Sequence, residues 1–218
     1  MANFYTIEKN AQIVIALLKE HGIKKIVVSP GATNVTFVAS IQKDSFFEIY
    51  SSVDERSAAY IACGLSAESG ESVVLSCTGA TASRNYMPGL TEAFYRKLPI
   101  LTITSTQVIS KVGHHIAQVT DRSVIPNDIV NYDLWDCEIK ANKAFLELTR
   151  NGGGPVHINL ATGYSTDYSV KELPKYKIIH RINPWTESFP KLPNGKVAIF
   201  IGSHLSMNNR LSNSIDSF

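Results

Sequence analysis

Residues 72–77, Ser-Val-Val-Leu-Ser-Cys, form an almost uninterrupted apolar run, and a glycine-containing turn, Thr-Gly-Ala-Thr at 78–81, follows it directly. A short run without polar alternation is typical of a strand that is buried on both faces of a parallel sheet. One helix is predicted before this strand, capped by Asp54 and running to Glu68, and another after it, from Ala82 to Tyr95. This order favours an α/β fold with a doubly wound, mostly parallel sheet flanked by helices.

The same alternation continues in both directions along the chain. In such sheets ligands bind beyond the carboxyl ends of the strands, so the candidate loops are 29–34, 53–56, 77–85 and 105–118. Apolar spacing, together with the glycines and prolines that end each run, predicts four more strands and three more helices. The strands are expected at 24–29, 46–53, 100–104 and 156–160, and the helices at 7–18, 34–42 and 141–150.

The composition changes after residue 164. Residues 1–164 are predicted to form the first domain and 165–195 an extended linker, which contains Pro174, Pro184, Pro190 and Pro193. The run Val-Ala-Ile-Phe-Ile-Gly at 197–202 resembles the first strand of another α/β domain, so 196–218 would be only its beginning. We therefore expect this chain to be part of a longer enzyme.

Charge and cysteine content limit the function classes. The formal net charge is +2 and no basic run stands out, so nucleic acid is not an expected partner. No apolar run approaches the roughly 20 residues that span a bilayer, and the N-terminus lacks the pattern of a signal peptide. Cys63, Cys77 and Cys137 lack metal-binding spacing, and an odd number without a disulfide framework favours a reducing, cytoplasmic location.

Glu55 is the most informative single residue, and its surroundings leave two interpretations open. An acid in the first turn of a helix usually interacts with the helix dipole, which is worth about 0.3–1 kcal/mol. Asp54 could fill that structural role alone, which would leave Glu55 for chemistry.

Neither a dinucleotide fingerprint nor a phosphate-binding P-loop is present, so nucleotide chemistry is not indicated.

Six short blocks occur in order: Ser-Pro-Gly at 29–31, Asp-Glu-Arg-Ser-Ala-Ala at 54–59, Cys-Thr-Gly-Ala-Thr-Ala at 77–82, Asn-Tyr-Met-Pro-Gly-Leu-Thr-Glu-Ala at 85–93, Leu-Pro-Ile-Leu at 98–101 and Gly-Pro-Val-His-Ile-Asn at 154–159. Together they resemble the N-terminal, pyrimidine-binding domain of thiamine-diphosphate-dependent enzymes. The resemblance covers roughly Ile7 to Leu160. Within the family it is strongest to the menaquinone-pathway synthase that adds a succinic semialdehyde unit to isochorismate, and weaker to acetolactate synthases and 2-oxoacid decarboxylases.

By this resemblance Glu55 lies against a nitrogen of the cofactor's pyrimidine ring. Sharing a proton with that nitrogen activates the thiazolium carbon for attack on a 2-oxoacid. The implied cofactors are thiamine diphosphate and Mg²⁺. The residues expected to contact the cofactor are Pro30, Gly31, Glu55, Thr78, Gly79, Thr81 and Asn85.

Further residues are implied to handle the substrate. His114 and His115 resemble the histidine pair that relays protons in pyruvate-type decarboxylases, and imidazole suits this because it titrates near neutral pH. A solvated loop with two incidental histidines is the alternative. Gln118 falls where carboligating members have a glutamine that faces the substrate, and Asn34 lies in the loop where the synthase holds a substrate carboxylate.

The chain departs from the family in three places. Ala32-Thr33-Asn34 replaces the Ser-Arg-Ser of the menaquinone synthase, and Gly79-Ala80-Thr81 replaces the usual Ser-Gly-Thr turn. The Gly-Asp-Gly motif that holds Mg²⁺ and the diphosphate does not occur in these residues. No metal ligand is therefore predicted in this chain, and alone it should bind the whole cofactor poorly.

The resemblance implies a transferase or lyase that decarboxylates a 2-oxoacid and releases or ligates the acyl unit. In this family the active site forms between halves of different subunits, which implies a homodimer or homotetramer. This chain alone is expected to be inactive. Two alternatives remain: the pyrimidine half of a split 2-oxoacid decarboxylase, and a non-catalytic α/β binding or assembly domain that keeps the fold.

Overall fold

The computed structural model describes residues 4–107, 109–119, 134–182, 191 and 209–217. The chain divides into two compact units, Met1–Arg181 and Ile182–Phe218. In the second unit the described structure is mainly the helix α7 (Asn209–Asp216). The strand predicted at 197–202 lies outside the described residues. Across the described helices, none is both long and apolar enough to cross a membrane.

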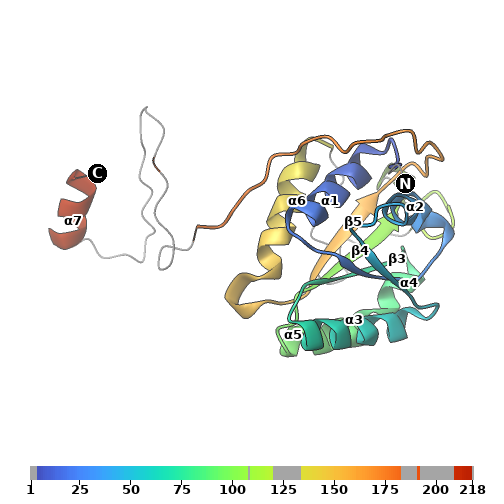
Figure 1. Cartoon of the computed structure of the whole chain (residues 1–218), viewed down its shortest axis with the longest axis horizontal. Coiled ribbons are helices and arrows are strands. Elements are labelled where there is room, and N and C mark those ends of the chain that lie inside the picture. The colour runs from blue at the N-terminus through green and yellow to red at the C-terminus, as the bar shows by residue number, and fades with distance from the viewer. Residues whose placement is uncertain (1–3, 108, 120–133, 183–190, 192–208, 218) are drawn as a thin grey trace. The chain divides into compact units, whose positions relative to one another are not determined.

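A five-stranded sheet forms the centre of the first unit (Figure 1). Its order is β2-β1-β3-β4-β5, and every neighbouring pair is parallel, as predicted. Each strand overlaps one of the predicted strands. They are β1 (Lys25–Val28), β2 (Glu48–Ser51), β3 (Val73–Thr78), β4 (Ile100–Thr106) and β5 (Val156–Ala161).

Helices cover both faces of this sheet, which confirms the doubly wound fold (Figure 1). One face carries α1 (Lys9–Glu20), α2 (Val35–Ile41) and α6 (Leu134–Leu148). The other face carries α3 (Glu55–Ser69) and α5 (Met87–Tyr95). Four short elements lie between these: η1 (Ala32–Asn34), α4 (Thr81–Asn85), η2 (Ile109–Lys111) and η3 (Arg150–Gly152).

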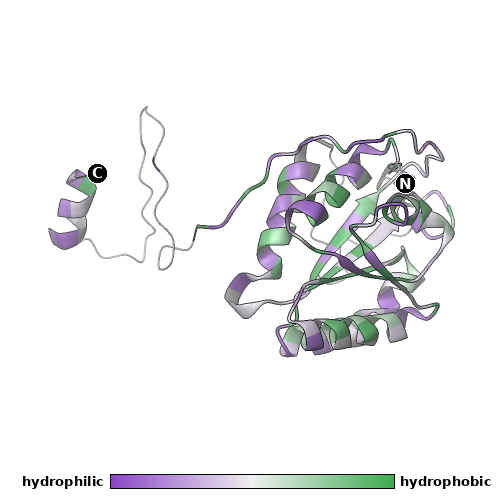
Figure 2. Cartoon of the chain, in the orientation of Figure 1, coloured by the Kyte–Doolittle hydropathy of each residue, from purple (hydrophilic) through white to green (hydrophobic). Residues whose placement is uncertain are grey.

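Successive residues of the central strands enter two separate cores, and the strands are largely hydrophobic in Figure 2. In β3, Val74 joins the core under α1, α2 and α6, whereas Val73 and Leu75 join the core under α3 and α5. All three are fully buried, which explains why this stretch lacks polar alternation. The edge strand β2 differs, because only one neighbour covers it and most of its residues are exposed.

Small residues let α3 and α5 pack closely together. A Cβ atom added at Gly89 in α5 would lie 2.4 Å from the Cβ of Ala59 in α3, much closer than two carbons can approach. Ala58, Ala59 and Ala62 are all fully buried. The alanine-rich face of α3 therefore serves helix packing, as its sequence indicates.

The helix predicted from Ala82 to Tyr95 is in fact two helices, α4 and α5, which meet at Tyr86. Pro88 lies in the first turn of α5. A proline suits the start of a helix because it lacks the N–H that an interior position would use. The break turns the Tyr86 side chain into the core, where it is fully buried.

Residues 165–181, predicted as a linker, are extended but bound to the first domain. Tyr5 and Val170 exchange two backbone hydrogen bonds, with N···O distances of 2.8 and 3.2 Å. The amide of Asn142 in α6 donates to Lys177 O at 2.8 Å and accepts from Ile179 N at 2.9 Å. These partners are remote in sequence, so the proline content that indicated a linker could not reveal the docking.

Candidate active site at the carboxyl edge of the sheet

The candidate site lies where the strand order reverses. The chain passes from β1 outward to β2 and then returns across β1 to form β3 on its other side. Neighbouring loops that leave in opposite directions open a crevice at the carboxyl ends of the strands. The loops after β1, β2 and β3 begin at this edge, and these are three of the four loops that the sequence nominates.

The loops after β1 and β3 touch each other at Gly31 and Thr78. A Cβ atom added at Gly31 would lie 2.3 Å from Thr78 Cγ2, so no larger residue fits there without movement. Gly31 has an extended backbone, with a φ of −169°, so it is the close approach that requires glycine here. The two predicted cofactor-contacting loops thus form one continuous wall.

Asn34 holds the loop after β1 in shape. Its side chain is buried, with Oδ1 accepting a hydrogen bond from Gly31 N at 2.9 Å and Nδ2 donating to Ser29 O at 3.0 Å. Both ends of the amide are therefore occupied within the loop. A direct contact between Asn34 and a substrate, as the sequence predicts, would require these bonds to break.

The two adjacent acids at the start of α3 have different surroundings. Asp54 is the N-cap, and its Oδ1 accepts a hydrogen bond from Ser57 N at 2.7 Å. That bond, supported by the Ser57 hydroxyl, holds the pKa of Asp54 below its ordinary value. Glu55 is partly exposed, and within the described part of the chain its carboxylate makes no hydrogen bond or ion pair. Asp54 thus caps the helix, and the Glu55 carboxylate remains available at the candidate site.

The turn after β3 contains a strained residue. Ala80 has a φ of 54° and a ψ of −116°, a conformation that suits glycine because it lacks a Cβ. It is nearly buried, with 4% of its surface exposed. Ala80 occupies the position of the glycine in the Ser-Gly-Thr turn that the family resemblance leads one to expect. The strain shows that the backbone keeps the glycine-type turn although the residue has changed.

Ala80→Gly is expected to stabilise the protein by about 1 kcal/mol, because it relieves a backbone strain of about 1–3 kcal/mol at the cost of some unfolded-state entropy. Chemical denaturation of the variant beside the wild type measures this. Ala82→Gly, inside α4, serves as the control and should destabilise instead. A loss of stability in Ala80→Gly would contradict the assigned turn conformation.

The remaining predicted cofactor contacts surround this turn. Gly79 is buried and Thr78 partly buried, whereas Pro30, Thr81 and Asn85 are exposed at the same edge of the sheet. Asn85 Nδ2 donates to Thr81 O at 3.1 Å within α4. These residues lie on the loops that flank Glu55, and their individual contacts with a cofactor stay predictions.

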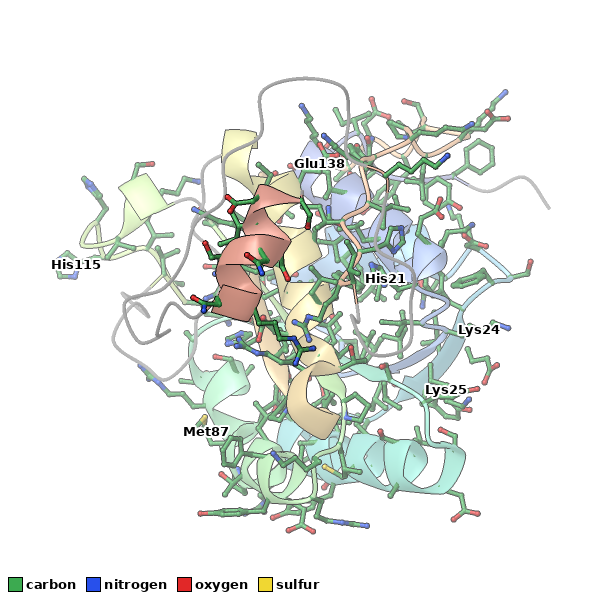
Figure 3. The ribbon with its side chains drawn as sticks, turned by 90° about the vertical axis from the view of Figure 1, so that its left-hand side faces the viewer. His21, Lys24, Lys25, Met87, His115 and Glu138 are labelled. Carbon is green, nitrogen blue, oxygen red and sulfur yellow. The ribbon has the colours of Figure 1, made fainter. Side chains whose placement is uncertain are left out.

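The candidate substrate residues after β4 lie on an exposed loop. His114, His115 and Gln118 are all exposed, and Figure 3 shows the ring of His115 directed away from the body of the domain. His115 and Gln118 have positive φ angles of 54° and 63°. Within the described part of the chain, no hydrogen bond or ion pair joins these side chains to Glu55. Their roles therefore stay predictions.

Tyr86 is a residue of this region that the sequence did not nominate. Its ring is fully buried in the core under α3 and α5, together with Ala58, Ala59 and Cys77. Burial, and to a smaller extent the neighbouring Cys77, raise the pKa of the Tyr86 phenol well above its ordinary value, and Glu55 acts in the same direction. The helix break at Tyr86-Met87-Pro88 was the available signal that this side chain points inward.

Metal ligands do not gather in this unit. Among the described residues, no group of three or more His, Cys, Asp and Glu side chains could hold a metal ion. Cys63 and Cys77 are buried, and neither forms a disulfide. Any Mg²⁺ that accompanies a diphosphate would need ligands from outside the described part of this chain.

Comparison with known proteins gives a consistent result. Residues 8–125 match the sequence model of the thiamine pyrophosphate enzyme N-terminal TPP-binding domain. The chain is 34% identical over 189 residues to 2-succinyl-5-enolpyruvyl-6-hydroxy-3-cyclohexene-1-carboxylate synthase of Phocaeicola vulgatus, and 33% identical to the enzyme of the same name from Bacteroides thetaiotaomicron. Both alignments cover 81% of this chain but only 34% of the relative, so the chain spans about a third of the length of these relatives.

Solved structures share the fold. Benzoylformate decarboxylase from Polynucleobacter necessarius superposes with a TM-score of 0.66 over 81% of this chain and 33% of its own length, at 20% identity. A thiamine diphosphate-dependent 4-hydroxybenzoylformate decarboxylase from Rhodococcus jostii superposes with a TM-score of 0.61 over 76% of this chain and 32% of its own length, also at 20% identity. At this level of identity the likeness establishes the fold alone.

Proposed function

Because this chain belongs to the thiamine pyrophosphate enzymes, we propose that its first unit supplies the pyrimidine side of a thiamine diphosphate site and that Glu55 is the activating carboxylate. The observation that carries this proposal is that the two adjacent acids at the start of α3 have different partners. Asp54 caps the helix, while Glu55 stands at the ligand-binding edge of the sheet without a partner in the described structure. An acid with no structural task at this edge is the group that the cofactor requires.

The loops around Glu55 are the proposed walls of the pyrimidine site. Gly31 and Thr78 bring the loops after β1 and β3 into contact, and a Cβ at Gly31 would collide with Thr78. We therefore expect Pro30, Gly31 and the 78–81 turn to wall the pyrimidine, with Thr81 and Asn85 at its rim.

When bound, thiamine diphosphate supplies a thiazolium carbon that attacks the 2-oxo group of a 2-oxoacid. Glu55 would hold a proton shared with the pyrimidine nitrogen, and its position in the first turn of α3 fixes where that proton lies. A domain with the Gly-Asp-Gly motif, outside these residues, is proposed to hold Mg²⁺ and the diphosphate.

The proposed reaction is decarboxylation of a 2-oxoacid, followed by release or ligation of the acyl unit. The two sequence relatives named above carry the name of a synthase, and the two solved structures named above are decarboxylases. The replacement of Ser-Arg-Ser by Ala32-Thr33-Asn34 leaves the choice of 2-oxoacid open. His114, His115 and Gln118 are proposed to act on the substrate from the loop after β4.

Exposed apolar side chains support a proposed assembly through the first unit. Val53, just before α3, is 87% exposed, and Phe94 in α5 is 63% exposed. Tyr60 and Ile61 in α3 are also exposed. Apolar side chains gathered on neighbouring helices favour an interface over open solvent.

Sedimentation of the complete enzyme is expected to show a homodimer or homotetramer, and a monomer at every concentration would contradict this.

The cofactor proposal predicts a strong dependence on the diphosphate half. The complete enzyme, meaning this chain together with a Gly-Asp-Gly domain in the same polypeptide or in a partner subunit, should bind thiamine diphosphate with Mg²⁺. The 218-residue chain alone should bind it far more weakly, because the charged half of the ligand has no metal bridge there. Calorimetric titration measures both. If the folded complete enzyme does not bind thiamine diphosphate, the proposed enzymatic function is refuted and a non-catalytic assembly domain is favoured.

A further inference from the structure

Tyr86 is placed where a buried residue can act on Glu55. It lies at the junction of α4 and α5, and its ring belongs to the same core as Ala58 and Ala59. These two alanines are three and four residues after Glu55 in α3, so they lie on the same face of that helix. The ring therefore packs one turn away from the Glu55 side chain.

Two buried hydroxyl groups, one on Tyr86 and one on Ser29, lie in this region. Tyr86 Oη and Ser29 Oγ are both inaccessible to solvent, and neither has a hydrogen-bond partner within the described structure. Ser29 follows β1 and leads into the Pro30-Gly31 wall of the site. A buried hydroxyl without a partner is costly, and each of these two can still form a further hydrogen bond.

The charge of the proposed catalytic group acts on the Tyr86 phenol. The groups that act on the phenol are the Cys77 thiol, the Ser29 hydroxyl and the Glu55 carboxylate. The Cys77 thiol donates to Thr78 O at 3.1 Å. A phenol that stays protonated in this setting is a hydrogen-bond donor, and a carboxylate is an acceptor.

We propose that Tyr86 is a positioning residue for Glu55: its buried hydroxyl, backed by Ser29, turns toward the Glu55 carboxyl group and holds it in the orientation that meets a pyrimidine nitrogen. This deepens the proposed function and rests on it. Hydrogen bonds at catalytic sites are often long in the unliganded protein and shorten when the ligand binds. Since neither hydroxyl is paired within the described structure, each can turn to a new partner.

The interaction between Tyr86 and Glu55 can be tested without cofactor. Tyrosine labelled with ¹³C at Cζ gives one NMR resonance for each tyrosine, and that of Tyr86 is identified by its loss in Tyr86→Phe. Glu55→Gln is expected to shift the Tyr86 resonance, and Ser29→Ala to shift it as well. Tyr50 is the internal control, because its exposed hydroxyl contacts Glu48 at 3.4 Å on the edge strand. A Tyr86 resonance that is unchanged in Glu55→Gln overturns the proposal.

The positioning role is tested in the complete enzyme. Tyr86→Phe is expected to lower kcat by about 10- to 100-fold with little change in KM for the 2-oxoacid, because a small misplacement of a catalytic group can cost about 100-fold. Tyr50→Phe should leave both constants unchanged. The melting temperature of Tyr86→Phe should not fall, because phenylalanine keeps the ring and removes an unsatisfied hydroxyl.

A wild-type kcat in Tyr86→Phe, measured where Glu55→Gln is inactive, overturns the proposal and leaves the role of Glu55 intact. If Glu55→Gln itself retains full activity, the proposed function of Glu55 fails instead. The NMR shift is independent of turnover, so it still decides whether Tyr86 and Glu55 interact. The two failures are thereby distinguished.

Discussion

Glu55→Gln is expected to lower kcat of the complete enzyme by at least about 100-fold, the usual contribution of a positioned acid or base. Glutamine keeps the size and shape of the side chain but cannot hold the proton that the carboxyl group shares with the pyrimidine. Binding of the cofactor should weaken less than turnover. Steady-state turnover with a panel of 2-oxoacids, measured beside calorimetric titration of thiamine diphosphate with Mg²⁺, separates the two effects.

Glu68→Gln is the matched control for this substitution. Glu68 lies in the same helix but near its other end, and it is exposed. It should retain wild-type turnover. The loss of an acid from the first turn of α3 costs only about 0.3–1 kcal/mol of stability, so Glu55→Gln should remain folded. Activity of Glu55→Gln within about tenfold of wild type would show that another group activates the cofactor.

Gly31→Ala is expected to lower the free energy of unfolding by about 1–3 kcal/mol, the usual cost of forcing a methyl group into a filled space. The added Cβ would lie 2.3 Å from Thr78 Cγ2, so one of the two site loops must move. That movement displaces the wall of the site, and cofactor binding should weaken as well. Chemical denaturation measures the first effect and calorimetry the second.

Thr78→Ser provides a rescue that tests the cause. Serine lacks Cγ2, and the next nearest atom, Thr78 Cβ, would be 3.7 Å from the new methyl group, an ordinary contact. The double variant Gly31→Ala/Thr78→Ser should therefore recover most of the lost stability, while Thr78→Ser alone changes it by no more than about 0.5 kcal/mol. If the double variant is as unstable as Gly31→Ala, the clash with Thr78 is not the reason that glycine is required.

The sheet was predictable because its signals are local. Val73, Val74 and Leu75 are apolar on both faces of a strand that helices cover on both sides, so their sequence alone indicated a buried parallel strand. The prediction was wrong for the segment after β3, where one helix was expected and the structure has two. Pro88 lies in the first turn of α5, and the two helices meet at Tyr86. A helical apolar pattern does not reveal such a break.

The site was predictable only in part. The sequence predicted Asp54 as the cap of α3, and the hydrogen bond from Ser57 N to Asp54 Oδ1 confirms it. What the sequence left open was whether Glu55 serves the helix dipole or chemistry. Asn34 illustrates the opposite case. Its place in the loop after β1 predicted a substrate contact, whereas its amide is bonded to Ser29 and Gly31. A polar residue in a ligand-binding loop can hold the loop as readily as the ligand.

The sequence by itself determined the doubly wound sheet, the loops at its carboxyl edge and the position of Glu55 at the start of a helix, because these follow from spacing within short segments. Only the tertiary structure decided that Gly31 meets Thr78, that residues up to Arg181 dock on the first domain, and that Tyr86 shares a core with the helix of Glu55. Each of these joins residues far apart in the chain. Such contacts depend on which strands become neighbours, and no local pattern specifies that.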